Sequence, residues 1–173
     1  MEISVDELAT IEDPADLAAC SLPELRGVRD AYRAVENGLS YVRRIVQGRF
    51  DIVSILLERR ADGQADTDLV ALLPESLSEH LRGSGLPRPP QDLEPPAWTD
   101  DIVAEADRLL PPGGLGALVD QSDADLRSAA DRLGALERDV SRARREAQVR
   151  MDRVQEEIVH RYQDGASVDD LLA

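Results

Sequence analysis

The chain has 173 residues and a formal net charge of −15, with one Phe, one Trp and three Tyr. So few aromatic residues do not supply a thick mixed core, whereas the abundant Leu, Val and Ala suit narrow seams between helices. The single Cys20 excludes an intramolecular disulfide, and the acidic balance disfavours direct binding to DNA.

The positive charge is confined to two parts of the chain. All 20 basic residues are Arg, and 17 of them lie in segments 24–60 and 123–162. These segments carry net charges of +3 and zero, so the remainder carries −18. Clustered arginines can hold a small anion locally, and the acidic remainder suits a basic protein partner. The N-terminus lacks the basic start and apolar run of a signal peptide, and no apolar stretch approaches the ~20 residues of a membrane span. We therefore expect a cytoplasmic protein with no membrane segment.

Residues 1–20 are an acidic N-terminal tail in which we expect one short helix, over 14–19. Residues 21–61 are predicted to form a long helix. It starts with Ser21 as N-cap and Glu24 completing a capping box, and it stops at Gly63. Its apolar residues recur mostly every three or four positions, as on an amphipathic helix. They are Leu25, Val28, Tyr32, Val35, Leu39, Val42, Val46, Val53 and Leu56.

Residues 62–121 form an acidic connector that holds eight of the ten prolines. We expect short helices over 69–73 and 75–81, a Pro-rich linker over 83–97, and another short helix that Thr99 caps and that ends before Pro111. The glycines of segment 112–116 resemble a phosphate loop in composition only, because the segment lacks the Lys and the preceding strand. We interpret that segment as a turn.

A second long helix is predicted over residues 122–164, with a similar cap at Ser122 and a stop at Gly165. Its apolar residues are Leu126, Leu133, Leu136, Val140, Ala143, Ala147, Met151, Val154 and Ile158. Residues 165–173 are a C-terminal tail. The expected fold is all-α, an antiparallel two-helix coiled coil with short accessory helices from the connector.

The two long helices repeat each other at an offset of 101 residues. The repeat includes a polar motif, E-x3-S-x2-R-x3-Q-x3-D, that occurs once in each helix without substitution. Its residues are Glu36, Ser40, Arg43, Gln47 and Asp51 in the first copy, and Glu137, Ser141, Arg144, Gln148 and Asp152 in the second.

The motif spacing keeps all five side chains within about 80° of arc, along about 22 Å of helix axis. In an antiparallel pair we expect Glu36 to face the Asp152 end and Asp51 to face the Glu137 end. The two motif arginines then meet at the centre of a pseudo-twofold surface.

The chemistry of the motif suits a ligand with anionic phosphates and donor-rich bases. Arg pairs with phosphate oxygens or with guanine O6 and N7, while Asp and Glu accept from the N1–H and N2 amine of guanine. Ser and Gln supply donors and acceptors to phosphate and sugar. Four carboxylates would repel a plain polyanion, so a twofold-symmetric guanine dinucleotide, cyclic di-GMP, fits the motif best.

Both motif copies resemble the signature of RsiG-type anti-sigma factors, and the resemblance covers helices 21–61 and 122–164. It implies a non-enzymatic protein that binds cyclic di-GMP, as a dimer, on an antiparallel coiled coil. It further implies that the partner is the sporulation sigma factor WhiG, held inactive while ligand is present. The use of Arg in place of Lys is compatible with the actinobacterial genomes in which the family occurs, but is not specific to them. Because one chain carries both copies, we expect a monomer.

Two other interpretations stay open. The nucleotide site is compatible with a different protein partner, and the polar rows alone are compatible with a ligand-free structural coiled coil whose flanks form salt bridges. No catalytic or metal-binding set stands out, because His80 and His160 lie in different segments without the residue spacing of a zinc site.

Overall fold

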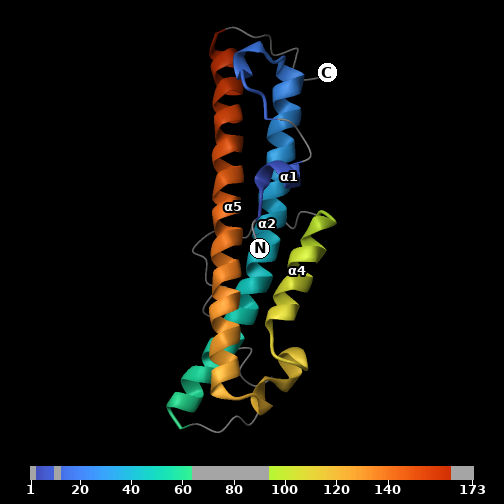
Figure 1. Ribbon diagram of the computed structural model, residues 1–173. Coiled ribbons are helices and arrows are strands. Elements are labelled where there is room, and N and C mark those ends of the chain that lie inside the picture. The colour runs from blue at the N-terminus through green and yellow to red at the C-terminus, as the bar shows by residue number, and fades with distance from the viewer. Residues whose placement is uncertain (1–2, 10–12, 64–93, 165–173) are drawn as a thin grey trace. The chain divides into compact units, whose positions relative to one another are not determined.

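The computed structural model describes residues 3–9, 13–63 and 94–164. Figure 1 colours the elements from blue to red in chain order: α1 (Val5–Ala9), η1 (Leu17–Ala19), α2 (Leu22–Ala61), α4 (Trp98–Leu109), η2 (Gly114–Asp120) and α5 (Asp123–Gln163). All regular elements in these ranges are helices, which confirms the all-α fold class. With 40 and 41 residues, α2 and α5 are each about 60 Å long.

The chain divides into two compact units, and both long helices contribute to each of them. We call residues 1–40 and 139–173 the terminal unit, and residues 41–138 the central unit. The terminal unit contains α1, η1, the start of α2 and most of α5. The central unit contains the rest of α2, then α4 and η2, and the start of α5.

Polar contacts between α2 and α5 show that the two helices run antiparallel within each unit. In the terminal unit, the interhelical pairs are Arg29 with Gln155 and Glu36 with Arg144. In the central unit, they are Arg43 with Glu137 and Arg60 with Asp123. The partner's number falls along α5 as the number rises along α2, so the expected antiparallel two-helix coiled coil is confirmed.

A seam of buried apolar side chains runs along both long helices. On α2 it comprises Leu25, Tyr32, Val35, Leu39, Val42, Val46, Val53 and Leu56. On α5 it comprises Leu126, Ala129, Leu133, Leu136, Val140, Ala143, Ala147, Val154 and Ile158. Val28 and Met151, which were expected in this set, are only half-buried. The mostly three- and four-residue spacing of the seam explains why these segments are helical, since burial of one continuous stripe stabilises a long amphipathic helix.

The ends of the long helices follow the local signals. The Ser21 N–H and hydroxyl donate to Glu24 at 2.6 and 2.7 Å, and Glu24 N–H donates back to the Ser21 hydroxyl at 3.4 Å. These bonds, above all the one from the backbone, lower the pKa of the Glu24 carboxyl. At the start of α5, Asp125 N–H donates to Ser122 Oγ at 3.2 Å. Gly63 follows α2 with a φ of +70°, which glycine adopts without steric cost.

The N-terminal segment is more structured than a tail with one short helix over 14–19. Its 3-10 turn, η1, covers only Leu17–Ala19, with the Asp16 side chain accepting from Ala18 N–H at 2.9 Å. The sequence analysis missed α1, whose Val5 and Ala9 are buried. Five residues carry too little periodicity to reveal a helix that depends on tertiary packing.

The accessory helix α4 does not begin with Thr99 as its cap. It starts at Trp98, and the capping position is Ala97, which makes no side-chain bond. Thr99 is instead buried in the first turn, where its hydroxyl donates to Pro96 O at 2.7 Å. A threonine that satisfies its hydroxyl within its own turn is free to point inward. The helices expected over 69–73 and 75–81, most of the linker 83–97, and the stop at Gly165 lie outside the described residues.

The 101-residue repeat extends beyond the long helices into the short elements. In the central unit, Arg49 of α2 bonds to Asp107 of α4 at 2.7 Å. In the terminal unit, Arg150 of α5 pairs with Asp6 of α1. Both the arginines and the aspartates are 101 positions apart, so the same ion pair attaches a short helix to the coiled coil twice. The bond from Arg150 lowers the pKa of Asp6.

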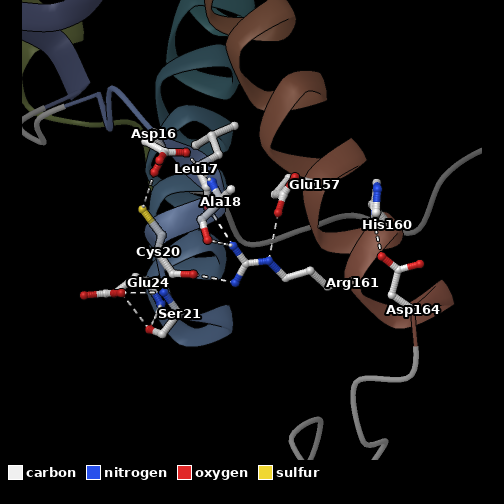
Figure 2. Close-up of polar contacts among 10 residues, drawn as sticks. All are labelled: Asp16, Leu17, Ala18, Cys20, Ser21, Glu24, Glu157, His160, Arg161 and Asp164. Atoms are coloured by element: carbon white, nitrogen blue, oxygen red, sulfur yellow. Dashed lines mark hydrogen bonds and ion pairs between the residues drawn. The ribbon is translucent and has the colours of Figure 1, made fainter.

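A second arginine pair repeats in the same way. Arg161, in the last turn of α5, donates to the carbonyls of Leu17 at 2.7 Å, Ala18 at 3.1 Å and Cys20, as Figure 2 shows. Arg60 of α2 donates to the equivalent carbonyls of Val119 and Gln121, both at 2.7 Å. The last carbonyls of a helical turn have no partner inside it, so each guanidinium satisfies the end of the 3-10 turn that precedes a long helix.

The bonds from Arg60 and Arg161 to these backbone carbonyls should contribute measurably to the free energy of unfolding. Hydrogen bonds to charged groups contribute about 1.5–3 kcal/mol, and the Arg60 and Arg161 side chains are only 16% and 21% exposed. We expect Arg161→Ala and Arg60→Ala each to lower the free energy of unfolding by an amount in that range, measured by urea denaturation. Arg132→Ala is the control, because Arg132 is exposed and, over the ranges that the structure describes, bonds only to the Ser128 carbonyl of its own helix. If the two variants lost no more unfolding free energy than the control, the bonds to the carbonyls would not stabilise the fold.

Candidate functional site

The ten motif residues all lie in the described helices, five on α2 and five on α5. Eight of them follow directly after a buried residue of the seam: Glu36 follows Val35, for example, and Arg144 follows Ala143. Asp51 and Asp152 follow the half-buried Phe50 and Met151. Because successive residues are about 100° apart around a helix, the motif forms a polar row along one edge of the seam. The motif side chains are half-buried except for Gln148 and Asp152, which are exposed.

Bonds within the first motif confirm that its residues are neighbours on the helix surface. Ser40 Oγ donates to Glu36 Oε1 at 2.9 Å, and Arg43 Nη1 donates to Gln47 Oε1 at 3.2 Å. Both pairs are four residues apart, which is the spacing of facing side chains on a helix. Glu36 and Ser40 therefore form one bonded pair in the terminal unit, and Arg43 and Gln47 form another in the central unit.

Each motif arginine is held by the glutamate of the other motif. In the terminal unit, Arg144 Nη1 lies 3.0 Å from Glu36 Oε1. In the central unit, Arg43 Nη1 lies 3.8 Å from Glu137 Oε1. These four side chains are 21–34% exposed, so the ion pairs are partly desolvated. The two contacts have the same donor and acceptor types and follow one antiparallel register.

The sequence predicts that the acidic ends of the two motifs face each other and that the motif arginines meet. Within each unit, the structure shows a contact between the glutamate of one motif and the arginine of the other. These contacts place opposite charges together in a partly desolvated setting, where their attraction is stronger than in open solvent.

Both motif arginines retain donor capacity. The Nε atoms of Arg43 and Arg144 are buried and have no hydrogen-bond partner among the described residues. A buried, unpaired donor costs about 1–3 kcal/mol, so its occurrence at the same position in both copies needs an explanation. A ligand that accepts hydrogen bonds on the polar row would supply one.

The short helices pack away from the polar rows. Arg49, which binds α4, lies two positions after Gln47, and Arg150, which binds α1, lies two positions after Gln148. Two positions correspond to about 200° around the helix, so these arginines point to the opposite side from the motif. The ion pairs that attach α1 and α4 therefore leave the motif side of each unit uncovered by those helices.

Other chemistry finds little support in the described ranges. They contain no group of three or more His, Cys, Asp or Glu side chains that could hold a metal ion. The exposed His160 lies 2.9 Å from Asp164, while His80 lies outside the described residues. Over the same ranges, no helix combines the length and the apolar character that a bilayer crossing requires.

Comparison with known protein families shows to which family the chain belongs. The RsiG-like family model matches residues 11–80 and 113–173, which include all ten motif positions. The chain belongs to the RsiG-like family. Membership indicates an anti-sigma factor of the RsiG type, whose partner is a sigma factor, and the family is generally one of non-catalytic regulators. No curated protein matches the chain.

Sequence reasoning missed several residues of this architecture although the signal was present. The pairs Arg49 with Arg150 and Arg60 with Arg161 have the same 101-residue offset as the motif, as do Asp6 and Asp107. The repeat therefore begins before Ser21 and includes the segments that contain the short helices. One further pair, Arg44 with Arg145, lies inside the motif itself.

Proposed function

We propose that this RsiG-like protein is a cyclic di-GMP-dependent anti-sigma factor that sequesters a WhiG-type sporulation sigma factor in the cytoplasm. The observation that carries the proposal is the pair of equivalent polar rows, in which a half-buried arginine of each motif contacts the glutamate of the other. The ligand-binding residues would be Glu36, Ser40, Arg43, Gln47, Asp51, Glu137, Ser141, Arg144, Gln148 and Asp152.

The donor and acceptor types match a guanine dinucleotide. Arginine forks suit phosphate oxygens or the O6 and N7 of guanine, and carboxylates accept from its N1–H and N2 amine. The unpaired Nε atoms of Arg43 and Arg144 supply one further donor in each copy. Two identical rows favour a ligand with twofold symmetry, and rows about 22 Å long leave room for two nucleotides, so we propose that cyclic di-GMP binds as a dimer.

The proposed mechanism is a ligand-gated clamp. Cyclic di-GMP would neutralise the motif arginines and bind residues of α2 and α5 together, and this arrangement would bind the sigma factor. The ligand switches the complex only if it binds the complex more tightly than the free protein. A nucleotide on half-exposed side chains keeps one face toward solvent, where a partner can touch it. The −18 charge outside the Arg-rich segments suits a basic surface on sigma. Both motif copies reside in one chain, so a monomer suffices.

The first prediction concerns the base. Titration calorimetry should show binding of cyclic di-GMP and none of cyclic di-AMP, because adenine lacks the N1–H and N2 amine that the carboxylates accept and presents an N6 donor in place of O6. Similar affinities for both nucleotides would reject recognition of the guanine edge.

The second prediction concerns the motif arginines. Arg43→Ala and Arg144→Ala should each weaken cyclic di-GMP binding at least tenfold, since loss of a charge-assisted hydrogen bond of about 1.5–3 kcal/mol gives an effect of that size. Arg132→Ala removes the same charge from an exposed position on α5 and should bind as the unaltered protein does. Equal losses for all three variants would mean that general electrostatics, not a site, holds the nucleotide.

The third prediction concerns the partner. On size exclusion, a purified WhiG-type sigma factor should co-elute with the protein when cyclic di-GMP is present and elute separately without it. Asp51→Ala combined with Asp152→Ala should abolish this ligand-dependent peak while leaving the helical circular dichroism intact. Co-elution with and without the nucleotide would mean that the protein binds sigma but that cyclic di-GMP does not control this binding. No co-elution in either sample, despite nucleotide binding, would point to an effector with another partner.

A further inference from the structure

The residue after each motif arginine is a second arginine in both copies. Arg44 and Arg145 are exposed, whereas Arg43 and Arg144 are half-buried and paired with glutamates. Neither Arg44 nor Arg145 has a hydrogen-bond or ion-pair partner among the residues that the structure describes. Most other arginines of α2 and α5 do have such a partner, so two uncommitted guanidinium groups at equivalent positions are unusual in this molecule.

Helix geometry places these arginines beside the polar rows. Arg44 lies four positions after Ser40 and three before Gln47, and Arg145 has the same relation to Ser141 and Gln148. Side chains three and four positions apart are neighbours on a helix surface. Each free guanidinium therefore lies along the outer border of its motif row, on the side away from the seam.

The charge of the rows explains what these arginines could do. The motif contributes Arg144, Glu36 and Asp152 to the terminal unit, and Arg43, Glu137 and Asp51 to the central unit. Each unit thus presents one positive and two negative motif charges. A nucleotide with two phosphodiester charges would meet net repulsion from these groups alone. Arg145 in the terminal unit and Arg44 in the central unit each bring that local charge to zero.

We propose that Arg44 and Arg145 are further nucleotide-binding residues, each donating hydrogen bonds to a phosphodiester oxygen of the ligand. The inference rests on the proposed function and adds a division of roles to it. The motif arginines, already engaged by glutamates, position the ligand within the rows. Arg44 and Arg145 offset the negative charge that the motif and the phosphates bring together. Neither has to break an ion pair with another described residue to do so.

The test is calorimetric titration of the full chain with cyclic di-GMP at several salt concentrations. Arg44→Ala and Arg145→Ala should each weaken binding at least tenfold, and the double variant should also show a smaller dependence of affinity on salt, because salt screens such exposed charges. Arg44→Lys combined with Arg145→Lys should retain the salt dependence, since the charge is kept. Arg132→Ala, which removes the same charge elsewhere on α5, should match the unaltered protein.

The outcomes separate this inference from the proposed function. If the unaltered protein binds no cyclic di-GMP, both fail. If it binds, and the double alanine variant binds within about threefold of it, only the role of Arg44 and Arg145 is overturned. Their proposed role is also overturned if the double alanine variant binds the nucleotide with unchanged affinity but no longer binds sigma. The two arginines would then contact the sigma factor and not the nucleotide. Thermal unfolding checks for a merely structural role: the melting temperature should not fall, since neither side chain has a partner to lose in the described part of the chain.

Discussion

The apolar seam between α2 and α5 is the constraint on which the other features depend. It sets which residues of the two helices face each other within each unit, and eight of the ten motif residues follow a seam residue by one position along the chain. That displacement keeps the polar row at the edge of the seam, where side chains are partly desolvated without being cut off from solvent. Hydrogen bonds and ion pairs are stronger there than on an open surface, because the local dielectric is lower.

The repeated arginine contacts show how the chain completes two units from one pattern. In each unit, one arginine attaches a short helix to the coiled coil and another satisfies the carbonyls of the 3-10 turn before a long helix. These contacts lie away from the motif, so the structural and the proposed binding roles use different sides of the same helices. The duplication is therefore a property of the whole architecture, and the motif is one part of it.

The sequence was sufficient to predict both long helices and their antiparallel pairing, because amphipathic periodicity without an interior proline and serine caps are local signals. The side-chain contacts across the seam were not predictable in the same way. The contact of Arg43 with Glu137 depends on side-chain positions that periodicity does not encode. The helix α1 escaped prediction because its attachment, Arg150 to Asp6, comes from a distant part of the chain. The proposed ligand-binding residues could be chosen from the sequence, because their donor and acceptor types and their repetition are visible there.

The pairing of each motif arginine with a carboxylate has a consequence for the concentration of ligand that the proposed response would require. Glu36 and Glu137 pair with the guanidinium groups that the proposed nucleotide would use, so each would compete with that ligand for its arginine. The strength of that internal competition would fix the nucleotide concentration at which the protein responds. The two contacts differ in length, 3.0 Å and 3.8 Å, so the two copies need not share one threshold. Sequence changes near the glutamates would then tune the set point of the response while leaving its chemical selectivity in place.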